Sequence, residues 1–234
     1  MRAVVAEKRE VAKGTLLVLF AVDGYPEYRP GSYFWVELPD RGRTDEKGLR
    51  RHISLVTSPT DLGVVGLATR LRNTAFKQTL AELEVGDEVE VEEPKGSFLL
   101  PADTGAEYVF VAGGIGITVF RSMLRYVAAE QLPYRITLVY SNRDRESAAF
   151  LDELEELERR IAGLRVVLTM TDEAGWEGET RRIDAEVLGD LLGDLENRQF
   201  LVAGPPAMAQ AVVDSLHGAG LAEDRVLADK FSGY

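Results

Sequence analysis

The chain has 234 residues, of which 45% are hydrophobic and 28% charged, and its net charge is −12. This is the composition of a globular protein with one large or two small domains, and no segment reaches the length of about 20 apolar residues that a membrane-spanning helix needs. The chain contains no cysteine and two histidines, which excludes a cysteine-bound iron–sulfur cluster within it and makes a metal site unexpected. The negative charge argues against nucleic-acid binding, and the N-terminus lacks an apolar export signal, so a cytoplasmic location is expected.

The first hundred residues alternate short β-rich runs with turns, which predicts an antiparallel β-barrel. One helix interrupts them and is expected to begin at Thr74 as its N-cap, with Phe76, Leu80 and Leu83 on one face. The polar segment 40–51 is expected to be an exposed, mobile loop. Its basic residues could form a docking patch, but the interleaved acidic residues favour a solvated loop. The expected strands are 15–21, 32–38, 51–56, 64–69 and 87–92.

From about residue 102, expected strands alternate with longer helices, the pattern of βαβ units around a parallel sheet. We therefore expect a two-domain β plus α/β fold, with an antiparallel β-barrel over residues 1–101 and a Rossmann-like parallel-sheet domain over residues 102–234. Ser147 is the expected N-cap of one helix in this half. The expected strands are 108–112, 135–140, 164–170 and 200–203, and the expected helices are 119–130, 148–160, 184–192 and 206–217.

Two glycine-containing turns follow expected strands of the second half. Residues 109–118 read VFVAGGIGIT, and residues 201–208 read LVAGPPAM. Glycines at such turns let a diphosphate approach the backbone, at the edge where open α/β sheets bind ligands. The first turn lacks the last glycine of the dinucleotide motif, so a plain strand-to-helix turn is the alternative. Two such turns opening the same crevice favour nucleotide binding.

In the barrel half, the sequence RHISLVTSP at residues 51–59 places Arg51 and Ser54 three positions apart. On a regular strand these side chains face opposite sides, so they would contact different parts of an elongated ligand. A surface arginine and an ordinary strand serine are the simpler explanation when these two residues are considered alone.

Together, five motifs in a fixed order resemble the ferredoxin–NADP reductase superfamily of flavin-dependent electron-transfer enzymes. The resemblance runs over essentially the whole chain, and it is specific because of the joint order and spacing. The matches are RHIS (51–54) to R-x-Y/F-S, PKGSF (94–98) to G-P-x-G-x-F, GGIGIT (113–118) to G-G-x-G-x-T-P, GPPAM (204–208) to C-G-P-P-x-M, and DKF (229–231) to E-x-F.

The resemblance implies an FAD, favoured over FMN, lying between the barrel and a nicotinamide-nucleotide domain. Arg51 would pair with the flavin phosphate, Ser54 would hydrogen-bond the ring near N5, and Thr74 and Ala75 would offer amides to the pyrophosphate. Ser54, Asp229 and Phe231 are the implied catalytic residues. The implied FAD-binding residues are Arg51, His52, Ile53, Ser54, Ala68, Thr69, Arg70, Thr74, Ala75, Gly96, Phe231 and Tyr234.

The resemblance also implies a site for NADPH or NADH. Phe231 or Tyr234 would cover the flavin face, with Phe231 favoured because it occupies the E-x-F position. Ser141 and Arg143, after the second strand of this half, suit a 2′-phosphate, whereas Asp144 points to NADH, so NADPH is favoured. The implied nucleotide-binding residues are Gly114, Gly116, Thr118, Ser141, Arg143, Gly204, Pro205 and Met208.

The chain departs from the family pattern at four positions. Ile53 replaces the aromatic residue that commonly stacks on the flavin, which weakens flavin retention unless other contacts compensate. Ala203 replaces a cysteine beside the nicotinamide, Asp229 replaces a glutamate, and Val119 replaces a proline. The hydride step would then depend mainly on the flavin and the nicotinamide themselves.

The leading hypothesis is an FAD-dependent oxidoreductase that takes hydride from NAD(P)H onto flavin N5. Its electrons would pass to a separate acceptor, either a protein such as ferredoxin, flavodoxin or an oxygenase component, or a small molecule. The alternatives are a non-catalytic flavin- or nucleotide-binding sensor and a free-flavin or quinone reductase. The oligomeric state is left open by the sequence.

Overall fold

The first part of the chain forms a six-stranded antiparallel sheet in the computed structural model, which describes residues 1–231. Its strands are β1 (Arg2–Ala12), β2 (Thr15–Ala21), β3 (Tyr33–Glu37), β4 (Arg50–Ser54), β5 (Val64–Arg70) and β6 (Glu88–Val91). The strand order is β4-β3-β6-β1-β2-β5. Just past β4, the Val56 amide donates to the carbonyl of Gly66 on β5 at 3.0 Å. The two outer strands therefore meet, and the predicted barrel is confirmed.

Helix α1 (Ala75–Glu82) lies against this barrel and begins where the sequence predicts. The Thr74 hydroxyl accepts a hydrogen bond from the Lys77 amide at 3.3 Å, as an N-cap does. Phe76, Leu80 and Leu83 are all buried in the barrel core. The spacing of apolar residues thus predicts both the helix and the face that it buries.

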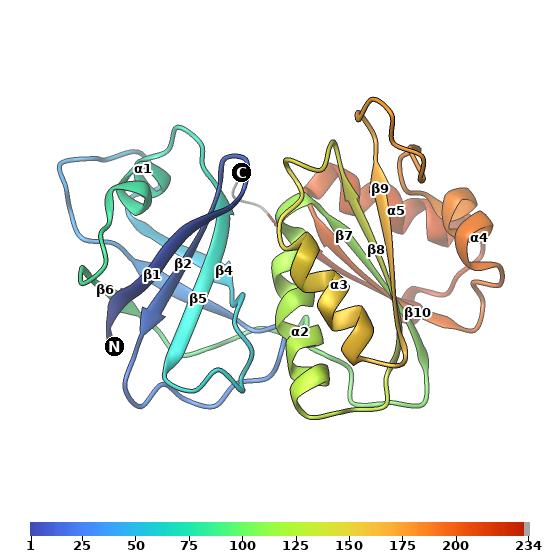
Figure 1. The fold of residues 1–234 in the computed structure, drawn as a ribbon, viewed down its shortest axis with the longest axis horizontal. Coiled ribbons are helices and arrows are strands. Elements are labelled where there is room, and N and C mark those ends of the chain that lie inside the picture. The colour runs from blue at the N-terminus through green and yellow to red at the C-terminus, as the bar shows by residue number, and fades with distance from the viewer. Residues whose placement is uncertain (232–234) are drawn as a thin grey trace.

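The second half is a five-stranded parallel sheet with helices on both faces (Figure 1). Alternating residues of the central strand explain this layering, because Phe110 and Ala112 pack on the α2 and α3 side and Val109 and Val111 on the α4 and α5 side. The sheet order is β11-β10-β7-β8-β9. The elements are β7 (Glu107–Gly113), η1 (Gly114–Gly116), α2 (Ile117–Ala129), β8 (Arg135–Asn142), α3 (Leu151–Arg160), β9 (Leu164–Met170), α4 (Ala185–Leu192), β10 (Arg198–Gly204), α5 (Pro206–Gly218), η2 (Glu223–Arg225) and β11 (Val226–Lys230). Within residues 1–231, no helix has the length and apolar character required to cross a membrane.

Two strands, β1 and β11, are absent from the sequence-based prediction. In β1, register shifts between Val5 and Glu7 and between Glu10 and Ala12 interrupt the regular pairing with β2. These irregularities destroy the apolar alternation by which a half-buried strand is identified. β11 is short, and its pairing with β10 is parallel.

The prediction that Ser147 caps a helix beginning at residue 148 is wrong. Ser147 instead closes a turn with Asp144, because its amide donates to Asp144 Oδ1 at 2.8 Å and its hydroxyl to the Asp144 carbonyl at 3.0 Å. The buried segment 148–150 follows, and the helix begins only after Phe150, whose φ is 65°. The serine is a local turn residue rather than a helix cap.

The segment expected to be a mobile loop is held against the barrel instead. Arg41 donates to the Glu82 carbonyl at 2.8 Å, Arg43 pairs with the Glu82 carboxylate, and Arg50 pairs with Glu92. Because these contacts engage three of the basic side chains locally, they argue against a docking patch.

Helix α2 joins the two halves of the molecule. Arg121 donates to the Val56 carbonyl, and Ser122 donates to the Thr57 carbonyl, each at 2.6 Å, and both side chains are buried. Arg121 also pairs with Glu153 of α3 at 2.7 Å. Burial raises the pKa of Glu153, but the guanidinium groups of Arg121 and Arg125 outweigh it and leave the pKa below its ordinary value. The helix is thus bonded to both halves.

We expect Arg121→Met to lower the free energy of unfolding by about 3 kcal/mol, because it leaves a buried carbonyl and carboxylate without this partner. Lys13→Met is the control, since Lys13 and Glu146 form an ion pair whose side chains are 76% and 71% exposed. That change should alter the free energy by less than about 1 kcal/mol. Urea titrations of the two variants and the wild type measure both values. Equal losses of unfolding free energy in the two variants would contradict the role of Arg121 in bonding the two halves together.

Candidate functional site

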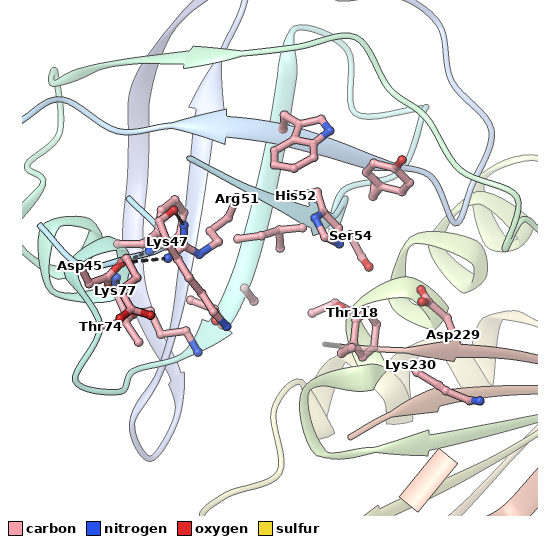
Figure 2. Close-up of a pocket in the computed structure, with 18 residues that line it drawn as sticks. Asp45, Lys47, Arg51, His52, Ser54, Thr74, Lys77, Thr118, Asp229 and Lys230 are labelled. Atoms are coloured by element: carbon pink, nitrogen blue, oxygen red, sulfur yellow. Dashed lines mark hydrogen bonds and ion pairs between the residues drawn. The ribbon is translucent and has the colours of Figure 1, made fainter. Parts of the chain in front are cut away.

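A pocket of about 610 Å³ lies where the barrel, α1 and the end of the parallel sheet meet. Its volume is in the range of small-molecule and cofactor sites, about 300–1,000 Å³. Figure 2 shows Arg51 at one end, near Asp45, Lys47, Thr74 and Lys77, and Ser54 at the other end, toward Thr118 and Asp229. The pocket is therefore elongated. One end is charged, and the other end offers hydroxyl and carboxyl groups.

Most residues predicted for the barrel side line this one pocket. Strand β4 contributes four consecutive residues to the lining. Arg51 and Ser54 contact different parts of the pocket, as the strand geometry predicts. The predicted residues that line it are Arg51, His52, Ile53, Ser54, Ala68, Thr69, Thr74, Thr118, Asp229 and Phe231.

At the charged end, backbone carbonyls orient the Arg51 guanidinium. Its Nη1 donates to the carbonyls of Lys47 and Gly48 at 2.5 and 2.9 Å, and the group lies 5.5 Å from the centre of the Phe76 ring. Nη2 is buried and has no hydrogen-bond acceptor among residues 1–231. The Asp45 carboxylate is 3.6 Å from it. A buried guanidinium nitrogen of this kind suits an anionic ligand.

The Asp45 carboxylate lies at the N-terminus of α1. It accepts hydrogen bonds from the amides of Ala75 at 2.8 Å and Lys47 at 2.9 Å. The bond from Ala75 is the main cause of the lowered pKa of Asp45, with a smaller contribution from Arg51. Ala75, whose amide is predicted to bind a pyrophosphate, is thus bonded to a carboxylate of the chain and does not line the pocket.

At the other end, hydroxyl and carboxyl groups from both halves come together. Ser54 and Thr118 are buried, and the Thr118 hydroxyl donates to the Ile115 carbonyl at 3.1 Å. Asp229 is half-buried, and burial raises the pKa of its carboxyl group, although His52 opposes the shift. The Phe231 amide donates to the Gly204 carbonyl at 3.1 Å, which fixes the end of β11 beside the pocket.

The glycine turns lie beside this pocket but do not line it. A Cβ at Gly116 would lie 2.2 Å from the Ala203 carbonyl oxygen, and one at Gly204 would lie 3.2 Å from the Gly113 backbone. The missing side chain of Gly116 therefore lets η1 approach β10, and that of Gly204 lets β10 lie close to the end of β7. Gly114 differs, because its φ is +51° and the first atom that a Cβ would meet is Arg70 Nη2 at 3.8 Å.

The remaining predicted residues lie outside the pocket lining. Arg70 reaches across to the α/β half and donates to the Ser147 carbonyl at 3.2 Å. Gly96 packs against the Tyr33 ring, and Arg143 pairs with Asp172 at 3.5 Å on the surface. Tyr234 lies outside the described residues. Those not lining the pocket are Arg70, Ala75, Gly96, Gly114, Gly116, Ser141, Arg143, Gly204, Pro205 and Met208.

Sequence reasoning missed several residues that line the pocket. Tyr33 and Trp35 alternate along β3 and make edge contacts with His52 at 5.5 and 5.0 Å between ring centres, so a period-two aromatic pair is the signal that could have found them. Asp45 is brought to the site by contacts between elements and has no local sequence signal. The missed lining residues are Tyr33, Trp35, Asp45, Glu46, Lys47, Phe76, Lys77 and Lys230.

The chain is similar to proteins of known families. Residues 110–214 match the family described as oxidoreductase NAD-binding domain. The chain is 29% identical over 200 residues to one component of the Na(+)-translocating NADH-quinone reductase of Psychrobacter cryohalolentis, covering 81% of this chain and 46% of that protein. It is 26% identical over 220 residues to the reductase component of propane 2-monooxygenase of Rhodococcus jostii, covering 89% and 56%. The chain spans about half the length of these relatives.

Solved structures share the fold over almost the whole chain. A ferredoxin NADP+ reductase from Neisseria gonorrhoeae with bound FAD and NADP has a TM-score of 0.83 at 19% identity and covers 98% of each chain. The cytochrome P450 reductase of Amycolatopsis has a TM-score of 0.83 at 23% identity, with 99% of this chain and 70% of that chain covered. An intact type IV self-sufficient cytochrome P450 monooxygenase is 28% identical and has a TM-score of 0.75. The match covers 100% of this chain and 28% of the monooxygenase chain.

Asp45→Asn is expected to raise the affinity for FAD, the ligand expected from the sequence motifs, about tenfold, because it removes a negative charge from the end where phosphates would bind. The affinity for riboflavin, which has no phosphate, should not change. Fluorescence titration of flavin-free protein measures both affinities. Asp40→Asn, in the same loop, is the matched control. An equal gain for riboflavin, or none for FAD, would refute this account of Asp45.

Proposed function

We propose that the chain is a member of the ferredoxin–NADP reductase superfamily and an FAD-dependent reductase that takes hydride from NAD(P)H, with NADPH favoured. Its electrons would pass to an acceptor outside these 234 residues, such as ferredoxin, flavodoxin or an oxygenase component. Residues 1–101 would hold FAD, and residues 102–234 would hold the nucleotide. The reductase component among its relatives supports this assignment.

The observation that carries the proposal is the elongated pocket, whose two ends offer different chemistry. The buried Nη2 of Arg51 suits a phosphate, since guanidinium groups bind phosphate oxygens through paired N–H donors. Ser54, at the other end, can either donate or accept a hydrogen bond, which suits a ring nitrogen that is an acceptor when oxidised and a donor when reduced. The residues present therefore fit FAD.

Bound FAD would supply the hydride-accepting and electron-releasing chemistry. The chain itself would orient the reactants: Ser54 and Thr118 flank the ring end, and Asp229 places a carboxyl group of raised pKa there. Phe231 lines the same end, so its side chain would yield to the nicotinamide, because hydride transfer needs a separation of about 3–3.5 Å. These assignments make Ser54, Asp229 and Phe231 the proposed catalytic residues.

On the nucleotide side, we assign the diphosphate to Gly114 and Thr118 rather than to every glycine of the motif. Gly114 has a positive φ, a Cβ there would make only an ordinary contact with the end of the Arg70 side chain, and the backbone there turns into the N-terminus of α2. The roles of Gly116 and Gly204 would be indirect, because their missing side chains allow η1 and the end of β7 to lie close to β10. Pro205 and Met208 follow β10 and would frame the nicotinamide.

An anaerobic visible spectrum of the purified protein, desalted and titrated separately with NADPH and NADH, tests the function. We expect flavin bands that bleach on adding nucleotide and that return with an artificial electron acceptor. A protein that retains flavin without bleaching would be a binding module. A protein that loses its flavin on desalting but reduces added FAD would be a free-flavin reductase, and either result would contradict the proposal.

Arg143→Ala is expected to lower the ratio of kcat/KM for NADPH to that for NADH about tenfold, because a guanidinium pairs with the 2′-phosphate that only NADPH carries. Asp172, 3.5 Å from Arg143, would compete for this cation. Steady-state kinetics with both nucleotides measures the ratio. Arg145→Ala is the control, since Arg145 lies 5.4 Å from the centre of the Trp176 ring. An unchanged ratio in Arg143→Ala would remove the basis for preferring NADPH.

A further inference from the structure

Lys77 is a buried lysine at the charged end of the pocket. Its side chain lines the pocket with Arg51 and Thr74, and the residue is 6% exposed. Lysine is rarely this buried in proteins, because removing an ammonium ion from water is costly. The residue belongs to the first turn of α1, directly behind the Thr74 cap, and sequence reasoning treated it only as part of the helix.

Two further effects disfavour a positive charge at this position. The first is repulsion by the positive charges of Arg72 and Arg51. Burial is the largest cause of the lowered pKa of Lys77, which falls to about 8, and these two charges lower it further. The second is the helix itself, since the N-terminus of a helix carries partial positive charge and disfavours a nearby cation. Burial, like charges and the helix terminus therefore all act against the ammonium form.

The charged groups around Lys77 come from three segments. Arg51 is on β4, Arg72 is in the segment before α1, and Asp45, Glu46 and Lys47 come from the loop before β4. The carboxylate of Asp45 is engaged with the Ala75 amide and lies beside Arg51. An anion entering the pocket would offset these unfavourable effects together, and in a flavin nucleotide the phosphate groups bring such a charge.

We propose that Lys77 is a second cation, next to Arg51, that binds the phosphate of the flavin nucleotide in its ammonium form. The inference rests on the proposed function, because it assumes that the pocket takes a flavin. It assigns to Lys77 a role that increases ligand affinity at the expense of the stability of the flavin-free protein.

A dependence of flavin affinity on pH follows. Below about pH 8, Lys77 is already protonated in the flavin-free protein, so binding needs no proton. Above that pH the flavin-free protein has lost this proton, and binding the phosphate takes it up again. The affinity for FAD should therefore fall by up to about tenfold for each pH unit above 8, whereas the affinity for riboflavin, which has the same ring and no phosphate, should not follow this dependence.

The experiment is to titrate flavin-free wild type and Lys77→Met with FAD and with riboflavin between about pH 6.5 and pH 9.5. At pH 7, Lys77→Met should bind FAD about 10- to 100-fold more weakly than the wild type, bind riboflavin equally well, and lose the fall in FAD affinity above pH 8. Because methionine removes a buried charge, the flavin-free variant should melt at a temperature equal to or above that of the wild type. Lys13→Met is the control, since Lys13 is an exposed cation that does not line the pocket.

Several outcomes would overturn the inference. These are an unchanged FAD affinity in Lys77→Met, an equal loss of riboflavin affinity, a wild-type pH dependence that survives in the variant, or an effect matched by Lys13→Met. A lower melting temperature combined with weaker riboflavin binding would show a structural role instead. If wild type binds neither FAD nor riboflavin, the proposed function itself fails, which distinguishes that result from the others.

Discussion

The site depends on the buried contact between α2 and the segment that follows β4. Arg121 and Ser122 of α2 each bond a backbone carbonyl of residues 56–57, and those carbonyls lie two and three residues beyond Ser54. The same helix has Thr118 in its first turn. One contact therefore fixes the distance between the two walls at the hydroxyl end of the pocket, to which each half contributes only one side. Burial makes this contact rigid, because exchanging either bond for water would require the halves to separate.

The second organising feature is the position of Arg51, whose charge is only partly compensated. The net charge is −12, and the arginines of the segment before β4 pair with carboxylates, as Arg41 does with Asp87 and Arg43 with Glu82. Arg51 is different, because its Nη1 bonds go to neutral carbonyls and the Asp45 carboxylate, at 3.6 Å from its Nη2, is also engaged by backbone amides. An acidic protein can thus hold a cationic pocket, since its surface charges are paired locally and screened within about 10 Å.

The sequence correctly predicted the structural features that depend on neighbouring residues within an element. The Thr74 cap, the apolar face of α1 and the βαβ alternation follow from neighbouring residues, and the structure confirms them. The predictions that failed concern features that depend on contacts between elements. The turn that uses Ser147 is set by Asp144 and by the buried segment behind it. The bulges of β1 follow from its pairing with β2. The glycine motif shows a different limit. Gly114 and Gly116 look alike in sequence, but only the structure shows that a Cβ at the first would reach the Arg70 side chain at 3.8 Å, whereas one at the second would collide with the Ala203 carbonyl oxygen at 2.2 Å.

In the proposed reductase, affinity and chemistry would be separated along the pocket. Ile53 offers the flavin an aliphatic contact where the family pattern has an aromatic ring, so stacking contributes less to retention at that end. The cations at the opposite end would then supply most of the binding free energy, because charge-assisted hydrogen bonds are about twice as strong as neutral ones. This division has a functional consequence. A ring not held by strong stacking would leave its face open to exchange between Phe231 and the nicotinamide, while the phosphates would keep the cofactor bound through each turnover.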